Sequence, residues 1–551
     1  MKVSIVLVFL GIISLSSQKQ EAPRVNTPLG SITGTLRKSH SNHKYESYEG
    51  IPYARPPVKS LRFRPPKPAK RWEHELFATK KGPVCMQYLM PSQNGSRVIG
   101  EEDCLYLNIY TPHRGNRKPL LPVMFWIHGG AFQFGSGNEA DETRLMDRKI
   151  VLVTINYRLG PFGFLSTGDR VVLGNMGLKD QNVALRWVSD NIAYFGGDPK
   201  SVTIFGVSAG ASSVHYHYMS TASAGLFQRG ISISGVALDP WSQNKRAPER
   251  AKKLGALMDC PTHSSEKMVE CLRNRPAHLI SEAVGDFMVW LYNPSTPFAP
   301  VIERQKCPRP FIKASPIEII TKGEVLDVPW ISGVVSEEGL YPAAEFIADE
   351  KLLRQLNDNW DNIAPYLLDY NDTIPLSRHK EVAEKARKHY LGSKEISSDT
   401  ALPLTHMIGD RLFAVDFEKA VRAQAKVNKS PVWTYYYTYR ATHSLSESLS
   451  HSNKNFGVSH TDDIYLVINP ALANTKNFQD IRMQKRLIDF YTSFAIKGVP
   501  KIGTKWREFE PEEERFRYLR ISGPRNISMS CSKNFGQKDF WNTIDFDENK
   551  L

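Results

Sequence analysis

The chain has 551 residues, of which 41% are hydrophobic and 23% charged, a composition that excludes a fibrous or disordered chain. The formal net charge is +14, but Lys and Arg are scattered without a run of five or more, so we expect no binding of nucleic acid. No internal repeat or low-complexity tract divides the sequence, and we expect one large domain over residues 18–551 with long insertions.

The first residues are typical of an export signal. Lys2 precedes an apolar run from residue 3 to about residue 15, and small residues lead to Gln18. Because a membrane span needs about 20 apolar residues, this run predicts a signal peptide over residues 1–17 rather than an anchor. No later run in the sequence has the length and apolar character of a span, so we expect a secreted, extracellular protein without a membrane span.

In an exported protein, the cysteines could form disulfides and the sequons could carry glycans. Cysteines pair in an oxidising compartment, but the spacing does not choose among the pairings. The six cysteines are Cys85, Cys104, Cys260, Cys271, Cys307 and Cys531. Candidate glycan acceptors are Asn94, Asn371, Asn428 and Asn526, of which Asn428 is the weakest because Pro431 follows its sequon.

Strand-like and helix-like segments alternate along the chain. Several strand-like runs are continuously apolar, as expected for a parallel sheet that helices cover on both faces. The runs are 123–127, 150–155, 202–205, 230–234, 328–335, 432–439 and 516–521. Apolar residues recur at helical spacing over 180–195 and over 478–497, the second ending at Gly498. The alternation predicts an α/β fold with a large, mostly parallel sheet flanked by helices.

Residues 206–210, Gly-Val-Ser-Ala-Gly, carry the best candidate for a nucleophile. A predicted strand, 201–205, precedes this segment and a predicted helix, 211–219, follows it. A serine at the apex of such a strained turn is a nucleophile elbow, in which neighbouring side chains would collide with the strand and the helix. We therefore predict Ser208 as nucleophile, with the backbone N–H of Ala209 beside the reacting carbonyl. The alternative is a glycine-rich turn without chemistry.

A second glycine-rich loop, His-Gly-Gly-Ala-Phe over 128–132, follows the strand 123–127. Such a loop can direct N–H groups at a developing oxyanion. The related lipase and esterase motif has a third glycine where this chain has Ala131, whose N–H can serve if its φ is negative. His128 precedes Ser208, whereas folds with this elbow order their residues serine, acid, histidine, so we expect His128 to be structural.

The acid and the base should therefore follow Ser208. Glu337 and Glu338 end the strand 328–335, and either could orient a histidine. His460 lies in a glycine-containing loop, where catalytic residues concentrate, whereas His379 and His389 lie in a charged, helix-like stretch and should face solvent. The histidines beyond residue 338 are His379, His389, His406, His443, His451 and His460.

From residue 48 to near the end, the sequence resembles the type-B carboxylesterase and cholinesterase family. Besides the motifs above, the resemblance rests on 48–53 (YEGIPY), 101–108 (EEDCLYLN), 156–160 (NYRLG), 177–181 (GLKDQ) and 195–199 (FGGDP). It implies the α/β-hydrolase fold, with Glu338 as acid and His460 as base. The oxyanion donors that it implies are the N–H groups of Gly130, Ala131 and Ala209.

The resemblance also assigns structural residues. It implies the disulfides Cys85–Cys104 and Cys260–Cys271, whereas Cys307 and Cys531 either pair or leave one thiol free. Trp241 matches an aromatic of the family's acyl pocket, with plain core packing as the alternative. The implied buried ion pairs are Arg62–Glu102 and Arg158–Asp180.

Three comparisons within the family indicate which branch this chain resembles most. Cholinesterases carry a tryptophan between the first two cysteines, and this chain has none there. Juvenile hormone esterases typically have glutamine where this chain has Val207. Residues 125–137, 336–344 and 433–440 most resemble venom carboxylesterases of bees and wasps.

We therefore expect a secreted carboxylesterase, a venom component by its resemblance, that needs no metal or organic cofactor. Its partner would be a small ester, uncharged because Phe132 and Phe134 flank the serine. One alternative is a juvenile hormone esterase-like hydrolase; another is a lipase, which would need an apolar lid that the sequence does not reveal. An adhesion protein of the same fold would lack a triad residue and add a membrane span, but this chain has all three residues.

Overall fold

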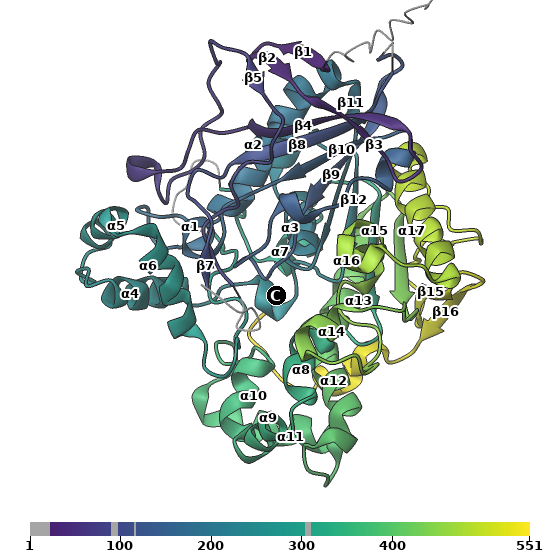
Figure 1. Cartoon of the computed structure of the whole chain (residues 1–551). Helices are drawn as coiled ribbons and strands as arrows, with labels where there is room; N and C mark the ends of the chain where they lie inside the picture. Colours follow the sequence, from purple (N-terminus) through teal and green to yellow (C-terminus); the bar gives the residue numbers. More distant parts are fainter. Residues whose placement is uncertain (1–21, 90–96, 115–116, 304–309, 551) are drawn as a thin grey trace, which may run out of the picture.

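The computed structural model describes residues 22–89, 97–114, 117–303 and 310–550 (Figure 1). The predicted signal peptide, Asn94 and Cys307 lie outside these residues. Within them, one 11-stranded sheet has the order β16-β15-β14-β13-β12-β11-β9-β10-β8-β4-β3.

The middle of this sheet, from β15 to β10, is parallel throughout. Its strands are β9 Leu121–Ile127, β10 Val151–Ile155, β11 Gly197–Val207, β12 Arg229–Ile233, β13 Trp330–Val335, β14 Val432–Tyr437 and β15 Phe516–Gly523. Each coincides with one of the apolar runs, so these strand predictions and the α/β class are confirmed.

Both margins of the sheet are antiparallel and were not predicted. They are β3 Thr35–Lys38, β4 Lys44–Pro52 and β8 Tyr106–Pro112 at one margin, and β16 Asn526–Ser532 at the other. Strand β4 has no apolar run because it buries two carboxylates, Glu46 and Glu49, which pair with Arg117 and Arg37. Shorter strands pair elsewhere: β1 Arg24–Thr27, β2 Gly30–Thr33 and β5 Leu76–Phe77, and β6 Gln87–Tyr88 with β7 Val98–Ile99.

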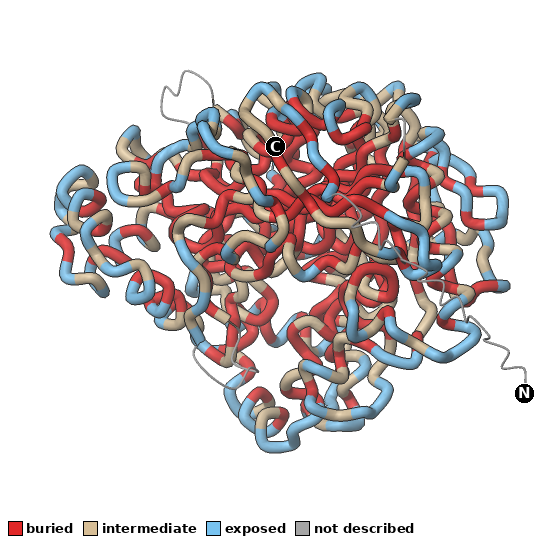
Figure 2. The backbone as a smooth tube through the Cα atoms, turned by 45° about the horizontal axis from the view of Figure 1, so that its top comes forward, coloured by how far each residue is buried: buried red, intermediate tan, exposed pale blue. Residues whose placement is uncertain are grey.

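The sheet separates two hydrophobic cores. Along β9, Val123 and Phe125 belong to one core, whereas Met124 and Trp126 belong to the other, because successive strand side chains point to opposite faces. The first core is packed by α2 Met176–Asn191, α3 Ala209–Tyr218 and α13 Val415–Val427, and the second by α15 Asp462–Ile468 and α17 Phe478–Lys497. Figure 2 shows the resulting buried centre and exposed periphery.

The predicted helices are present. The pattern over 180–195 forms α2 and a 3-10 turn, Ile192–Phe195, and α17 ends at Gly498 with φ of 71°. Further helices are α1 Gly160–Phe164, α7 Pro316–Thr321, α12 Ala401–Gly409, α14 Leu445–Ser450, α16 Pro470–Ala473 and α18 Lys538–Trp541.

Long insertions form two helical groups outside the sheet (Figure 1). One group, at the left of the view, is α4 Ala247–Leu257, α5 Ser265–Asn274 and α6 Ala277–Glu282. The other, at the bottom, is α8 Leu340–Ile347, α9 Glu350–Asp358, α10 Trp360–Leu367 and α11 His379–Leu391. In the described residues, no helix combines the length and the apolar character that crossing a bilayer requires.

Covalent and ionic cross-links follow the expectations. The disulfides Cys85–Cys104 and Cys260–Cys271 are present. Cys531 is exposed and has no disulfide partner among the described residues, which do not include Cys307. Arg62 binds Glu102 through two hydrogen bonds of 2.6 Å. Arg158 binds Asp180 through bonds of 2.8 and 2.7 Å.

Candidate active site

Ser208 occupies the sharp turn between β11 and α3. Its backbone has φ 58° and ψ −125°, a conformation that a residue with a side chain rarely adopts. The N–H of Ser208 donates to the carbonyl of Ile233 on β12 at 2.8 Å, which fixes the turn against the next strand. Ser208 as a whole residue is 7% exposed.

The glycines on either side of Ser208 are required by close backbone approach. A Cβ at Gly210 would lie 2.1 Å from the carbonyl oxygen of Ile127, and one at Gly206 would lie 2.6 Å from the carbonyl of Gly210. No side chain fits at these distances, so the glycine spacing of the motif follows from the geometry of the turn.

Glu338 and His460 face each other across the ends of two segments that are far apart in sequence. Nδ1 of His460 lies 2.6 Å from Oε2 of Glu338, and Oε1 of Glu338 accepts from the N–H of Val335 at 2.8 Å. A carboxylate at Nδ1 holds the proton there and leaves Nε2 as an acceptor. Among the described residues, Nε2 has no hydrogen-bond partner, and His460 lines the same cavity as Ser208.

Glu337, the other candidate carboxylate, has no hydrogen bond or ion pair with His460 in the described residues. Its Oε2 accepts from the N–H of Val458 at 2.7 Å, and its own N–H donates to the carbonyl of Val458 at 3.1 Å. Its Oε1 lies 3.8 Å from Nε2 of His406. Glu337 therefore holds the loop that leads to His460, whereas Glu338 contacts the imidazole.

The Glu337–His406 contact shifts the pKa values of both side chains. Burial raises the pKa of Glu337, but hydrogen bonds from His406, Ser336 and the N–H of Val458 outweigh it and lower that pKa below its usual value. The nearby Glu337 carboxylate, 3.8 Å away, raises the pKa of His406 above its usual value. The pair is therefore favoured when His406 is protonated.

The glycine-rich loop turns through left-handed conformations beside Ser208. Gly130 has φ 104°, and Ala131 and Phe132 have φ of 52° and 59°. The loop curls because the N–H groups of Gln133 and Phe134 donate to the carbonyl of Gly130 at 2.8 and 3.0 Å. The expected negative φ at Ala131 is therefore wrong, because this curl imposes the left-handed region. In the described residues the N–H of Ala131 makes no backbone hydrogen bond, so it can still serve as a donor with a positive φ.

The three expected oxyanion donors nevertheless lie around the nucleophile. Gly130 and Ala131 line the cavity together with Ser208. Ala209 is the first residue of α3, so its N–H has no acceptor within the helix.

His128 lies behind the glycine-rich loop, as expected for a structural residue. Its ring stacks on Tyr157 with centroids 4.3 Å apart, and its Nδ1 lies 2.8 Å from the carbonyl oxygen of Gly129. Burial lowers the pKa of His128 to about 4, so it is neutral at physiological pH. Of the two histidines expected to face solvent, His389 is exposed, but His379 is half-buried because its Nε2 lies 2.9 Å from the carbonyl oxygen of Ile374.

A cavity of about 320 Å³ opens at Ser208 and His460. In the described part of the chain, its lining has no Asp, Glu, Lys or Arg. The lining residues are Leu89, Gly129, Gly130, Ala131, Phe134, Val207, Ser208, Tyr292, Tyr341, Leu445, Ser448, Leu449, His460, Thr461 and Tyr465.

Trp241 lies beside this cavity rather than in its described lining. It is 5% exposed, and its Nε1–H donates to the carbonyl of Leu412 at 2.8 Å. Its ring packs between Phe132 and Phe413, at centroid distances of 6.3 and 5.7 Å. These contacts are those of core packing, and an acyl-pocket role for Trp241 remains a prediction.

Sequence reasoning missed the aromatic residues around the imidazole. Tyr341 and Phe413 have ring centroids 5.4 and 4.7 Å from that of His460. Tyr341 lies three residues after Glu338, so its proximity to the acid was a usable signal. Phe413 lies 47 positions before His460 on another element (460 − 413), and nothing local marks it.

The elbow, the carboxylate-bound histidine and the loop of N–H donors at the ends of parallel strands are the arrangement of an α/β-hydrolase. Comparisons with known proteins agree. Residues 21–541 match the model of the carboxylesterase family. The chain therefore belongs to that family, and it is a carboxylic ester hydrolase.

Individual relatives support this assignment. The chain is 61% identical to venom carboxylesterase-6 of Apis mellifera, over 100% of this chain and 99% of that protein. It is 38% identical to a juvenile hormone esterase of Tribolium castaneum, over 87% of this chain and 84% of that protein. The crystal structure of juvenile hormone esterase from Manduca sexta, with OTFP covalently attached, superposes with a TM-score of 0.81 and 27% identity. That match covers 95% of this chain and 99% of the other.

Proposed function

We propose that the protein hydrolyses esters through an acyl-enzyme on Ser208. His460 Nε2 takes the proton of the Ser208 hydroxyl as Oγ bonds to the ester carbonyl carbon. The negative oxygen that forms is stabilised by the N–H groups of Gly130, Ala131 and Ala209. The carbon–oxygen bond to the alcohol then breaks, and the alcohol leaves with the proton from His460.

The second half of the reaction releases the acid. His460 takes a proton from water, whose oxygen bonds to the acyl carbon, and the bond to Ser208 Oγ breaks as Oγ regains a proton. Glu338 keeps Nδ1 protonated and offsets the imidazolium charge in both halves. The observation that carries the proposal is the 2.6 Å contact between Glu338 and His460 at the cavity that contains Ser208.

The cavity supports uncharged esters of modest size as substrates. Transferring a charged group into a lining without ionised side chains would leave the charge unpaired, which is unfavourable. Leu89, Phe134, Leu445 and Leu449 provide apolar contact. A volume of about 320 Å³ is at the small end of ligand pockets, which begin at about 300 Å³.

We further propose that the protein is secreted and serves in venom. Support comes from the two disulfides, which are typical of an oxidising compartment, and from the 61% identity to a venom carboxylesterase.

Among the described sequons, Asn526 is exposed and suits a glycan best. Asn371 donates to Asp372, and both amide atoms of Asn428 are buried, which disfavours these two.

A second candidate is a juvenile hormone esterase-like activity. The structural match to the Manduca sexta enzyme and the uncharged cavity favour it. Val207 argues against it, because juvenile hormone esterases typically have glutamine before the serine. Comparing kcat/KM for juvenile hormone and for p-nitrophenyl esters of matched acyl size would separate the two.

The deciding experiment is hydrolysis of p-nitrophenyl acetate, butyrate and octanoate by the wild type and by Ser208→Ala. Ser212→Ala is the matched control, because Ser212 lies one turn further along α3 and its buried hydroxyl has no partner in the described residues. We expect turnover to vanish in Ser208→Ala alone and to fall with the longest acyl chain. Equal turnover in Ser208→Ala and Ser212→Ala would refute the role of Ser208.

A further inference from the structure

The helix that carries Phe413 contains an irregular turn. Residues Asp410–Ala414 form a π-helical turn between α12 and α13. Such turns widen a helix, leave a carbonyl without its usual partner and occur frequently at functional sites. Here the carbonyl of Leu412 accepts from Nε1 of Trp241 at 2.8 Å, and Phe413 packs 4.7 Å from the His460 ring.

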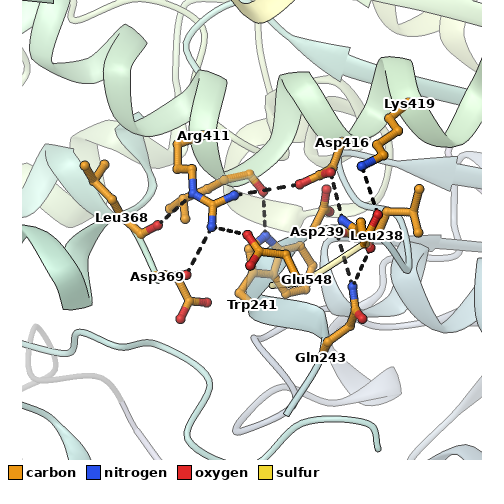
Figure 3. A network of polar contacts seen from close by, with 12 residues as sticks. Leu238, Asp239, Trp241, Gln243, Leu368, Asp369, Arg411, Asp416, Lys419 and Glu548 are labelled. Atoms are coloured by element: carbon orange, nitrogen blue, oxygen red, sulfur yellow. Dashed lines mark hydrogen bonds and ion pairs between the residues drawn. The ribbon is translucent and has the colours of Figure 1, made fainter. Parts of the chain in front are cut away.

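Arg411, on the same turn, is buried at the centre of a polar network (Figure 3). Its Nε donates to the carbonyl of Leu368 at 3.1 Å, and its Nη2 donates to the carbonyl of Asp369 at 3.3 Å. Nη2 also binds the carboxylate of Glu548, and the guanidinium lies 3.8 Å from the ring of Phe546. Residues far along the chain thus hold the guanidinium in place.

Asn549 connects the same late segment to the residues on either side of Trp241. Its Nδ2 donates to the carbonyl of Leu238 at 2.7 Å and to Oδ1 of Asp416 at 3.0 Å. Its Oδ1 accepts from Nε2 of Gln243 at 3.0 Å. Leu238 and Gln243 flank Trp241, whose ring packs on Phe413, so segment 546–549 contacts the segments that carry Trp241 and Phe413.

This segment is more buried than its position late in the chain would suggest. Glu548 and Asn549 are 5% and 7% exposed, whereas the neighbouring side chain of Asp547 is 63% exposed. The segment also lies beyond residues 21–541, which match the carboxylesterase family model.

We propose that segment 546–549 positions His460 for catalysis, acting through Arg411 and Phe413. The inference rests on the proposed function, in which His460 is the base. Glu548 and Phe546 fix Arg411, the π-helical turn carries that constraint two residues along to Phe413, and Phe413 limits the tilt of the imidazole. Since Phe413 is not in the described lining of the cavity, disturbing this positioning should lower kcat and leave KM unchanged.

The test is a double-mutant cycle of Glu548→Gln and Phe413→Leu, with p-nitrophenyl butyrate as substrate. Asp547→Asn is the matched control, because it removes a carboxylate from the same segment without touching Arg411. We expect Glu548→Gln to lower kcat on the order of 10-fold at unchanged KM, within the 100-fold that a 1 Å misplacement can cause. The double variant should be no slower than Phe413→Leu alone, and Phe413→Tyr should restore most of the rate.

Two outcomes would overturn the inference in an active enzyme: an unchanged kcat in Glu548→Gln, or losses that multiply in the double variant, which mark independent sites. If Glu548→Gln does not fold, Phe546→Leu enters the same cycle, because it removes a contact to Arg411 and leaves the buried charges in place. Absence of activity in the folded wild type would instead contradict the proposed function.

Discussion

The serine and the histidine of the candidate site are held in different ways. Ser208 is fixed by the backbone of one continuous segment, β11, the turn and α3, in which Gly206 and Gly210 leave no room for a side chain. His460 is fixed by side chains from distant segments. Glu338, which contacts its Nδ1, lies 122 residues earlier in the chain, and the rings of Tyr341 and Phe413 pack against the imidazole.

Because they are held differently, Ser208 and His460 should respond differently to substitutions around them. The serine depends on local steric limits, so that substitutions of its glycines should act on folding and activity together. The histidine depends on hydrogen bonds and packing between segments, so that substitutions there should lower kcat with little loss of stability. The loop before His460 shows this, because Glu337 and Asp462 both accept from its backbone N–H groups.

The largest effect should come from Glu338→Gln. The amide can no longer hold the proton on Nδ1 of His460, so that Nε2 loses its role as acceptor, and we expect kcat to fall on the order of 10⁴-fold. Steady-state hydrolysis of p-nitrophenyl acetate measures this, with circular dichroism to show an intact fold. A loss below 10-fold would mean that Glu338 does not orient the base.

Gly210→Ala tests whether close backbone approach holds the turn at Ser208. The new Cβ would lie 2.1 Å from the carbonyl oxygen of Ile127, so the backbone must move, and we expect a loss of about 3 kcal/mol in the free energy of unfolding together with most of the activity. Gly225→Ala is the control, because no atom of the described residues lies within 4 Å of a Cβ placed there, and only its positive φ is strained, by roughly 1 kcal/mol. Equal losses in urea unfolding would show that close approach is not what selects glycine at the elbow.

Glu337→Gln sharpens the contrast between the adjacent carboxylates. It keeps the contact to the N–H of Val458 but weakens the hold on the loop, and we expect a decrease in kcat of about 10-fold at unchanged KM. The measurement is the same as for Glu338→Gln. A loss as large as that of Glu338→Gln would contradict the assignment of different roles.

The smallest effect concerns pH. The depressed pKa of Glu337 gives stability that is lost as pH falls through it, and the raised pKa of His406 gives stability that is lost as pH rises through it. The pair should therefore stabilise the fold most at about pH 5–6, between the ordinary pKa values of the two groups. Because the His406 side chain is 43% exposed, we expect less than about 1 kcal/mol.

The comparison of Tm for wild type and His406→Gln from pH 5 to pH 9 measures this effect. The difference should be greatest at the acidic end and should shrink as His406 loses its proton. A difference that grows with pH would reverse the assigned sign.

Features with a local cause could be predicted from the sequence. The parallel strands are continuous apolar runs because both faces are covered, and the elbow is visible because steric exclusion demands glycine at fixed positions. The margins of the sheet escaped prediction because β4 buries charged residues whose partners, Arg37 and Arg117, lie elsewhere in the chain.

Features with a non-local cause could not be predicted. The residues alone did not choose between Glu337 and Glu338, because the choice depends on which carboxylate faces a loop 122 residues away. The left-handed backbone of Ala131 follows from the curl of its loop rather than from its own preference. Phe413 contacts His460 from a π-helical turn, and no local pattern in the sequence marks either the turn or the contact.

The central claim is that Ser208 forms an acyl-enzyme. The most direct measurement is rapid mixing with excess p-nitrophenyl acetate, followed by acid quenching, proteolysis and mass spectrometry. We expect a burst of p-nitrophenol close to one equivalent and a single acetyl group on the peptide that contains Ser208. Turnover by the intact enzyme with no acetyl group on Ser208, or with the group on another residue, would contradict it.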